Sequence, residues 1–302
     1  MPATRRLCTI TKNNTNPAYV GARLGAERVA AAHGCTAIHF FPQVPDDVAQ
    51  QRAAIEAALA SKPDAILMAP VHPTALNETI ARIREAGLPL VYFVSNTEGL
   101  EPDCFITSDN HALALETGRY LVRHLLGEAG GGGNVAVIEG HPVSPTTAPR
   151  TRGFLQAAAE EAGITVVGQA PGMYQQDGGR VAMEQILAQG HTVHGVMAAN
   201  DYSAMGALEA LDTAGQQAHV VSVNAMPDAI RAIRTGRLLA SAAYDAMQMG
   251  CIATEAAIRL LRGERPPPVI TLPVDLITVA NCAAWDRPYA ERPLPEWERA
   301  VR

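Results

Sequence analysis

The chain has 302 residues, a length typical of about two domains. It carries 24 Lys and Arg residues against 30 Asp and Glu, a net charge of −6, which disfavours nucleic acid and anionic membrane surfaces because both need basic patches. No apolar run approaches about 18 residues, so no transmembrane helix is predicted.

The N-terminus and the cysteines constrain the cellular compartment only loosely. The stretch "MPATRRLCTITKN" has no apolar segment of the kind that marks a signal peptide. Two interpretations stay open, a mature form whose signal peptide has been removed and a cytoplasmic protein. The five cysteines form no C-x-x-C pair, so they are interpreted as small buried hydrophobes rather than zinc ligands, and their number argues mildly against an oxidising compartment.

Strand-like and helical stretches alternate along the chain. In the first half, strands are predicted at 7–12, 36–41, 64–69 and 88–93, and helices at 17–32, 48–60 and 74–86. In the second half, strands are predicted at 134–138, 165–168, 195–198, 220–223 and 239–243, and helices at 112–126, 150–162, 179–189, 202–214 and 227–235. Short connections and near-continuous apolar strands indicate two doubly wound α/β halves with parallel sheets.

The C-terminal part has a different character. Residues 266–281 are extended and rich in β-branched side chains, which suits strands that cross between the two halves. Residues 282–302 are rich in proline and charge and are expected to pack along the surface.

Ligands of open α/β sheets bind beyond the carboxyl ends of the strands, so the residues at those ends are the candidate site. They are mostly amides, hydroxyls and aromatics: Asn16, Tyr19, Ser95, Asn96, His141, Tyr174, Asn200, Asn224 and Tyr244. Amides donate and accept hydrogen bonds, and aromatic rings pack on the apolar face of a sugar, so the set favours a neutral hydroxylated ligand. It has few charges, no carboxylate pair and no nucleophile–base couple, so no catalytic residue, metal site or cofactor is predicted.

Each candidate also has a purely structural interpretation. Asn200 and Asp201 stand where a strand meets a helix, and both residue types are favoured helix caps. Asn16 suits a loop, Tyr174 and Tyr244 suit a half-buried core, and His141 beside a proline suits a solvated turn. Because so many of these side chains converge on strand ends, the set supports ligand binding more strongly than any single residue does.

With these residues in view, the chain resembles the type I periplasmic substrate-binding proteins of the ribose and sugar-binding cluster, which are related to lactose-repressor effector domains. The resemblance covers about residues 7–281. It rests on "NPAYVGARLGAE", "PDAILMAPVHPTAL", "GLPLVYF", "ITSDNHALALETGRYL", "RTRGFLQAA", "MAANDYSAMGALEAL" and "AIRTGRLLASAAYDAMQMG", taken in this order.

The resemblance implies two lobes that close on a ligand across a three-segment hinge. The first lobe would be 1–108 plus 245–273, and the second 109–244 plus 274–302. Asn16 and Tyr19 would contact the ligand from the first lobe. From the second, Asn200 would hydrogen-bond it and Tyr174 would stack on it, whereas Asp201 would serve the helix start.

The departures from the family pattern indicate a changed ligand. Where ribose-type members carry an Asp-Arg pair, this chain has Val94 and Ser95. Ala148 stands where those members carry an arginine. Asn224 stands where the family usually has an aspartate, and Tyr244 stands where it has a glutamine near the hinge. Charged groups make the stronger hydrogen bonds, so their replacement predicts an uncharged ligand other than ribose. Arg150 and Arg152 are the only arginines placed where they could bind an anionic ligand.

Three classes of function compete. The favoured one is the solute-binding component of an ABC importer, a monomer that delivers a neutral carbohydrate or polyol to a membrane permease. The alternative is a ligand-sensing module of a signalling or regulatory system with the same fold. Strand one begins at Leu7, which leaves no room before it for a DNA-binding segment. An enzyme is disfavoured because no G-x-S-x-G, H-E-x-x-H or phosphate-loop motif is present.

Overall fold

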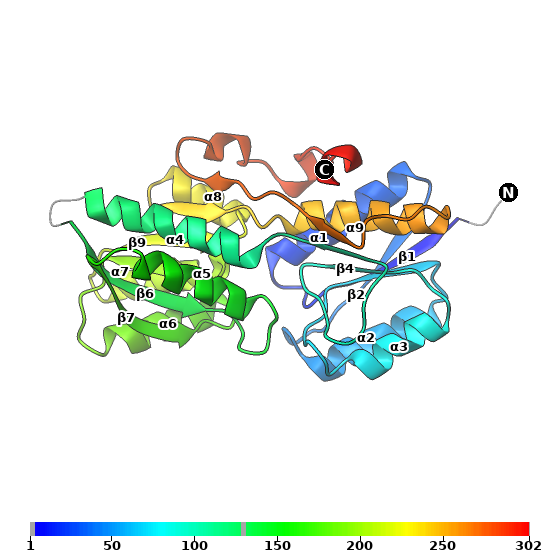
Figure 1. The fold of residues 1–302 in the computed structure, drawn as a ribbon, viewed down its shortest axis with the longest axis horizontal. Helices are drawn as coiled ribbons and strands as arrows, with labels where there is room; N and C mark the ends of the chain where they lie inside the picture. Colours follow the sequence, from blue (N-terminus) through cyan, green and yellow to red (C-terminus); the bar gives the residue numbers. More distant parts are fainter. Residues whose placement is uncertain (1–3, 128–130, 302) are drawn as a thin grey trace. The chain divides into compact units, whose positions relative to one another are not determined.

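The computed structural model describes residues 4–127 and 131–301, which form two compact units (Figure 1). The first unit comprises 1–108, 245–273 and 288–302, and the second 109–244 and 274–287. The predicted fold class, doubly wound α/β units with largely parallel sheets, is confirmed.

The first unit is built on a six-stranded parallel sheet within the described residues, in the order β11-β5-β4-β3-β1-β2. Its strands are β1 (Arg6–Ile10), β2 (Thr36–Phe40), β3 (Ala65–Met68), β4 (Leu90–Phe93), β5 (Cys104–Thr107) and β11 (Val269–Thr271). Its helices are α1 (Pro17–Ala32), α2 (Val48–Ala60), α3 (Asn77–Glu85), α9 (Ala246–Leu261) and α10 (Trp297–Ala300), with a 3₁₀ turn η2 (Tyr289–Glu291).

Strands β3 and β4 are buried along their whole length because helices cover both faces of the sheet. Helices α1 and α9 lie together on one face, and α2 and α3 lie on the other (Figure 1). Gly25 of α1 lets α9 approach closely, since a Cβ there would lie 2.7 Å from the carbonyl oxygen of Met247. Strand β1 lies between β2 and β3, so the segment after β1 occupies the switch point of the sheet, where such folds bind ligands.

The second unit has its own six-stranded sheet in the described residues, in the order β12-β10-β9-β8-β6-β7. Its pairings are parallel except for β10 with β12, which are antiparallel. Its strands are β6 (Gly133–Glu139), β7 (Ile164–Pro171), β8 (Gly195–Ala198), β9 (His219–Val223), β10 (Ala240–Ala242) and β12 (Leu276–Ile277). Its helices are α4 (Asn110–Gly127), α5 (Thr147–Ala159), α6 (Gln176–Leu187), α7 (Asp201–Thr213) and α8 (Pro227–Arg234), with a 3₁₀ turn η1 (Cys282–Ala284).

Helix α9 and strand β5 of the first unit were not predicted, nor were the short η2 and α10 of the tail. Helix α9 is apolar around most of its circumference and is buried against α1, β3, β4 and β5, so it lacks the polar face that marks a surface helix. Strand β5 has only four residues, too few for a clear alternation of polar and apolar side chains.

The C-terminal tail belongs to the first unit, whereas the resemblance assigned 274–302 as a whole to the second lobe. Arg28 of α1 donates hydrogen bonds to the carbonyl oxygens of Tyr289 and Arg292. The guanidinium of Arg292 lies 3.5 Å from the carboxylate of Asp245, the N-cap residue of α9, and both side chains are buried. As a result the chain passes between the units at 287–288 as well as at 108–109, 244–245 and 273–274.

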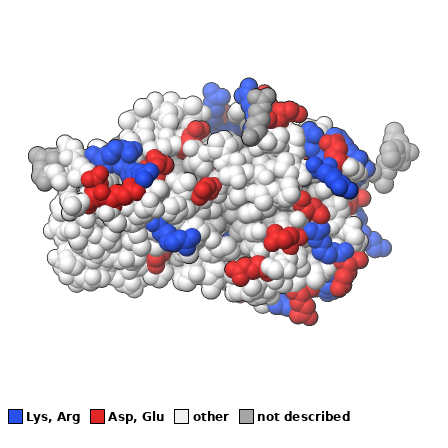
Figure 2. Space-filling view, viewed as in Figure 1, with Lys and Arg blue, Asp and Glu red and all other residues white. Residues whose placement is uncertain are grey.

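Charge on the surface is mixed. On the face in Figure 2, Lys and Arg side chains lie beside Asp and Glu instead of gathering into one basic patch. Exposed ion pairs such as Arg82–Glu56 and Arg237–Asp212 account for part of this pattern. Among the described helices, none has the length and hydropathy that a membrane crossing requires. The thiols of Cys8, Cys104, Cys251 and Cys282 are free and buried, as predicted, and Cys35 is free and half-buried.

Candidate ligand-binding residues at the strand ends

Backbone strain is concentrated at the carboxyl ends of the strands. Among the described non-glycine residues with positive φ, Lys62 ends helix α2, and all the others follow strands: Asp46, Val94, Met173, Tyr174, Asn224 and Ala225. Val94 has φ +69°, a conformation rare for a β-branched side chain. Strain of this kind costs about 1–3 kcal/mol per residue and clusters at binding sites.

In the first unit, the segment after β1 is held by its own side chains. The Asn13 carboxamide oxygen accepts a hydrogen bond from the backbone N–H of Asn16. The Asn16 carboxamide oxygen accepts one from the N–H of Ala18, so Asn16 is the N-cap of α1. Thr11 and Arg23 both donate to the carbonyl oxygen of Asn13. This segment is therefore a largely buried turn that is fixed by hydrogen bonds, and not an irregular surface loop.

The expectation that the strand ends hold few charges is wrong for this unit. Lys12 follows β1 and Asp46 follows β2, their side chains are 4% and 5% exposed, and Lys12 Nζ lies 4.0 Å from Asp46 Oδ1. Neither residue was predicted, because a lone lysine in a loop is usually solvated and Asp46 lies 34 positions further along the chain. The signal that could have found Lys12 was its place directly after the buried strand at the switch point.

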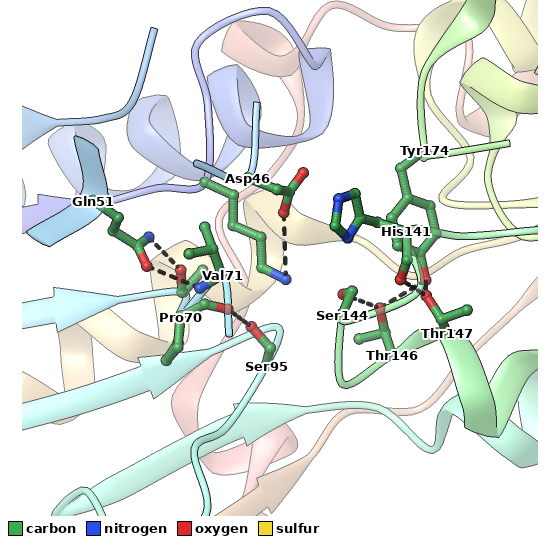
Figure 3. Close-up of polar contacts among 12 residues, drawn as sticks. Asp46, Gln51, Pro70, Val71, Ser95, His141, Ser144, Thr146, Thr147 and Tyr174 are labelled. Carbon is green, nitrogen blue, oxygen red and sulfur yellow. Dashed lines mark hydrogen bonds and ion pairs between the residues drawn. The ribbon is translucent and has the colours of Figure 1, made fainter. Parts of the chain in front are cut away.

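Gln51 and Ser95 fix the neighbouring strand ends (Figure 3). The fully buried Gln51 amide donates to the Ala69 carbonyl oxygen and accepts from the N–H of Val71. The predicted site residue Ser95 is buried and donates to the carbonyl oxygen of Pro70 at 2.7 Å. Its hydroxyl thus ties the loop after β4 to the loop after β3.

Tyr174 is the best-defined aromatic residue of the second unit. Its hydroxyl group hydrogen-bonds the hydroxyls of Thr146 (2.8 Å) and Thr147 (3.1 Å), as Figure 3 shows. The ring lies against Gly140, where an added Cβ would come within 2.1 Å of it. The ring of this half-buried residue is therefore anchored by the end that carries its hydroxyl group.

Asn200 and Asp201 divide their roles differently from the prediction. The Asn200 carboxamide oxygen accepts from the N–H of Ser203, which makes Asn200 the N-cap of α7. Its amide N–H donates to the carbonyl oxygen of Tyr174 and so holds that strained turn. The predicted capping role of Asp201 is wrong, because its carboxylate accepts hydrogen bonds from Ser222, from Ser241 (2.7 Å) and from the N–H of Met226 (2.7 Å).

Asp201 thereby supports the turn that carries Asn224. Ser241, which donates to Asp201, accepts a hydrogen bond from the N–H of Ala225 at 3.0 Å. Complete burial raises the pKa of Asp201 to about 6, although its hydrogen bonds and the nearby Arg150 charge act in the opposite direction.

The guanidinium group of Arg150 is held by contacts within the second unit. It donates to Asn110 (2.8 Å) and to the carbonyl oxygen of Ala199 (2.6 Å). It also lies over the ring of Tyr244, 4.6 Å from the centroid, and 5.8 Å from that of Tyr174. Arg152 is exposed on α5. The structure thus gives Arg150 a supporting role beneath two candidate aromatics.

The other predicted residues differ in exposure, and Tyr19 lies in the first turn of α1 while the rest follow strands. Tyr19 and Tyr244 are 9% and 2% exposed, and Asn96, His141 and Asn224 are half-buried. Within the part of the chain that is described, the buried Nδ1 of His141 and Nε2 of Gln175 have no hydrogen-bond partner. Both could serve a bound polar group, and Gln175, like His141, stands at a strand end in the sequence.

Comparisons with known proteins agree with this geometry. Residues 8–265 match the family described as "Periplasmic binding protein domain". The ribose import binding protein of Bacillus subtilis is 29% identical over 264 residues, covering 87% of this chain and 84% of that protein. A putative rhizopine-binding protein of Rhizobium meliloti is 30% identical over 247 residues, covering 79% of each chain.

Among solved structures, a periplasmic solute-binding protein of an ABC transporter from Actinobacillus succinogenes, with bound D-allose, superposes with a TM-score of 0.86. Its sequence is 23% identical, and the match covers 93% of this chain and 99% of that one. The sheet order, the polar and strained strand ends and the matched length lead to one conclusion: the chain belongs to the periplasmic binding protein family.

Proposed function

We propose that the protein is the solute-binding component of an ABC importer and that it binds a neutral sugar, polyol or similar small hydroxylated ligand. The observation that carries this proposal is the set of amide, hydroxyl and aromatic side chains on strained turns at the strand ends of each unit. The names of relatives such as the ribose import binding protein of Bacillus subtilis support a sugar as the ligand.

The proposed contacts come from both units. Asn16, Tyr19, Ser95 and Asn96 contribute from the first, and His141, Tyr174, Asn200, Asn224 and Tyr244 contribute from the second. Asn16 and Asn200 each use one oxygen lone pair for a helix cap, and a carboxamide has a second lone pair and further N–H groups. Tyr174 would present its ring face to the C–H groups of a sugar.

We propose that the protein binds its ligand without catalysing a reaction. In this proposal it is a monomer that acts in the periplasm and delivers the ligand to a membrane permease. The hydroxyls of Ser95 and Thr147 donate to backbone carbonyl oxygens and not to a base. Hydroxyls held in this way are not activated as nucleophiles.

A thermal-shift screen with D-ribose, D-allose, myo-inositol, D-gluconate and glucosamine tests the proposal. A ligand at about 100 times its Kd adds about 2.7 kcal/mol to the free energy of unfolding. We expect stabilisation by at least one neutral compound, with a Kd that changes little between low and high salt. Stabilisation by the sugar acid alone, with a Kd that rises steeply with salt, would contradict the neutral ligand.

A further inference from the structure

The first half of the C-terminal tail is anchored on the second unit. Strand β12 pairs with β10, and Cys282 lies in the apolar core of that unit with Trp285 packed against the same core. The N–H groups of Trp285 and Asp286 both donate to the carbonyl oxygen of Cys282. The carboxylate of Asp286 forms an ion pair with Arg234 at the end of α8. The tail is therefore fixed to the second unit up to residue 286.

The second half of the tail is anchored on the first unit. The guanidinium of Arg28 on α1 donates to the carbonyl oxygens of Tyr289 and Arg292, at 3.1 Å and 2.7 Å. The ring of Tyr289 lies against Gly21 of α1, where an added Cβ would fall 3.0 Å from the ring. The absence of a side chain at position 21 thus lets the tail lie close to this helix. The tail is fixed to the first unit from residue 289 onward.

The tail also holds a point where the chain crosses between the units. The chain enters the first unit at 244–245, and Asp245 is the N-cap of α9. Its carboxylate accepts hydrogen bonds from the N–H groups of Met247 and Gln248. The guanidinium of Arg292 lies 3.5 Å from the same carboxylate, and both side chains are buried. The second anchor of the tail therefore includes a crossing segment itself.

No more than two residues, Arg287 and Pro288, join the two anchors. The three Cα–Cα steps from Asp286 to Tyr289 span at most about 11 Å when the chain is fully extended. Pro288 has φ −53° and ψ 147°, which is already an extended conformation, and its ring fixes φ. Straightening the segment therefore adds little length. The two anchor points cannot separate beyond this limit unless one anchor is broken.

We propose that residues 286–289 act as a strap that restricts how far the two units move relative to each other. Motion between two bodies of a chain comes from φ and ψ changes at a few residues of the connecting segments. A short connection with an anchor on each body limits the range of that motion. The strap thereby leaves the ligand-free protein fewer conformations, and, if the proposed sugar-binding function holds, it raises the affinity for the ligand.

The test measures the distance distribution between one spin label on each unit, by double electron–electron resonance. The exposed residues Ala53 on α2 and Ala159 on α5 are replaced by cysteine to carry the labels. Cys35→Ser removes the half-buried native thiol, and the other native cysteines are buried. The strap is lengthened by inserting Gly-Ser-Gly-Ser-Gly-Ser between Arg287 and Pro288.

Two controls separate the length of the strap from other effects. The same insertion after Gly190, in the exposed turn that follows α6, adds the same residues and leaves the strap unchanged. Pro288→Gly keeps the length of the strap but removes the proline ring. Arg28→Ala is a second way to release the strap, because it removes two hydrogen bonds that hold the tail on α1.

We expect the insertion at the strap to broaden the distance distribution of the ligand-free protein, because it raises the limit of the span from about 11 Å to about 32 Å. Arg28→Ala should broaden the distribution to a lesser extent. The control insertion and Pro288→Gly should give the wild-type distribution. Equal distributions for wild type, the strap insertion and Arg28→Ala would overturn the proposal.

Calorimetry with D-ribose, D-allose and myo-inositol tests the effect on affinity. The strap insertion should weaken binding of the probe that binds wild type about two- to tenfold, in proportion to the loss of binding-competent conformations. Equal or tighter binding would overturn the effect on affinity. Failure of all three probes to bind wild type at millimolar concentration would contradict the proposed sugar-binding function, whereas the distance distributions would still decide whether the strap restricts motion.

Discussion

Replacing Asp201 with alanine should destabilise the second unit by an amount that depends on pH. The substitution removes the acceptor of three buried donors, the hydroxyls of Ser222 and Ser241 and the backbone N–H of Met226. The hydroxyls can turn toward other acceptors, but the amide cannot. A lost buried hydrogen bond of this kind costs about 1–3 kcal/mol, so we expect a total of about 3 kcal/mol under mildly acidic conditions.

The raised pKa of Asp201 fixes the sign of the pH dependence. Between its ordinary pKa of 3.8 and the folded value of about 6, the folded protein keeps a proton that the unfolded chain has released. The contribution of this group to stability is therefore full below about pH 4 and falls by about 3 kcal/mol as the pH rises past 6. Between about pH 4.5 and 7.5 the fall is about 2 kcal/mol.

Urea unfolding of wild type and Asp201→Ala, followed by circular dichroism at those two pH values, checks this reasoning. The difference in unfolding free energy should shrink by about 2 kcal/mol from the lower to the higher pH. A difference that grows with pH would show that the folded pKa is depressed. Asp201→Ala combined with Ser222→Ala should cost less than the sum of the two single changes, since they share one hydrogen bond.

Four further outcomes are expected. Asn16→Ala and Asn200→Ala should each lower the unfolding free energy by about 1 kcal/mol through the lost helix cap and weaken sugar binding about 5- to 150-fold, and calorimetry showing unchanged affinity in both would remove them from the site. Gly140→Ala, whose Cβ would fall 2.1 Å from the Tyr174 ring, should reduce sugar affinity with no loss of folded structure by circular dichroism; unaltered affinity would separate this ring from binding. Arg292→Ala should lower the unfolding free energy by about 3 kcal/mol by leaving a buried carboxylate without its cation, and a melting temperature equal to that of wild type would argue against this role. Small-angle scattering should show a smaller radius of gyration with saturating sugar if the units close on the ligand, whereas an unchanged radius would count against closure.

The sequence predicted the fold better than the details of the site. Periodic apolar runs located most strands and helices, because burial on both faces of a sheet is a local pattern that the chain repeats. Strand-end position then selected Tyr174 and Asn200, and the structure gives both a place in one hydrogen-bonded turn.

What was missed depends on contacts between distant residues. Asp201 was interpreted as a cap because its neighbours in sequence suggested one, whereas its partners lie on β9, on β10 and before α8. Lys12 meets Asp46 only because β1 and β2 pair, and Arg292 meets Asp245 only because the tail returns to α9. No local period or spacing encodes such pairs.

The repeated passage of the chain between the units has a consequence for the order of folding. The first unit takes β11 and its tail from beyond residue 245, and the second takes β12 from 274–287. During synthesis, neither unit can complete its sheet until most of the chain has left the ribosome. Strand β5 pairs with β11, and the buried face of α1 packs on α9, and both partners are made more than a hundred residues later. Exposed apolar surface of this kind promotes aggregation in a chain that does not yet include its last segments.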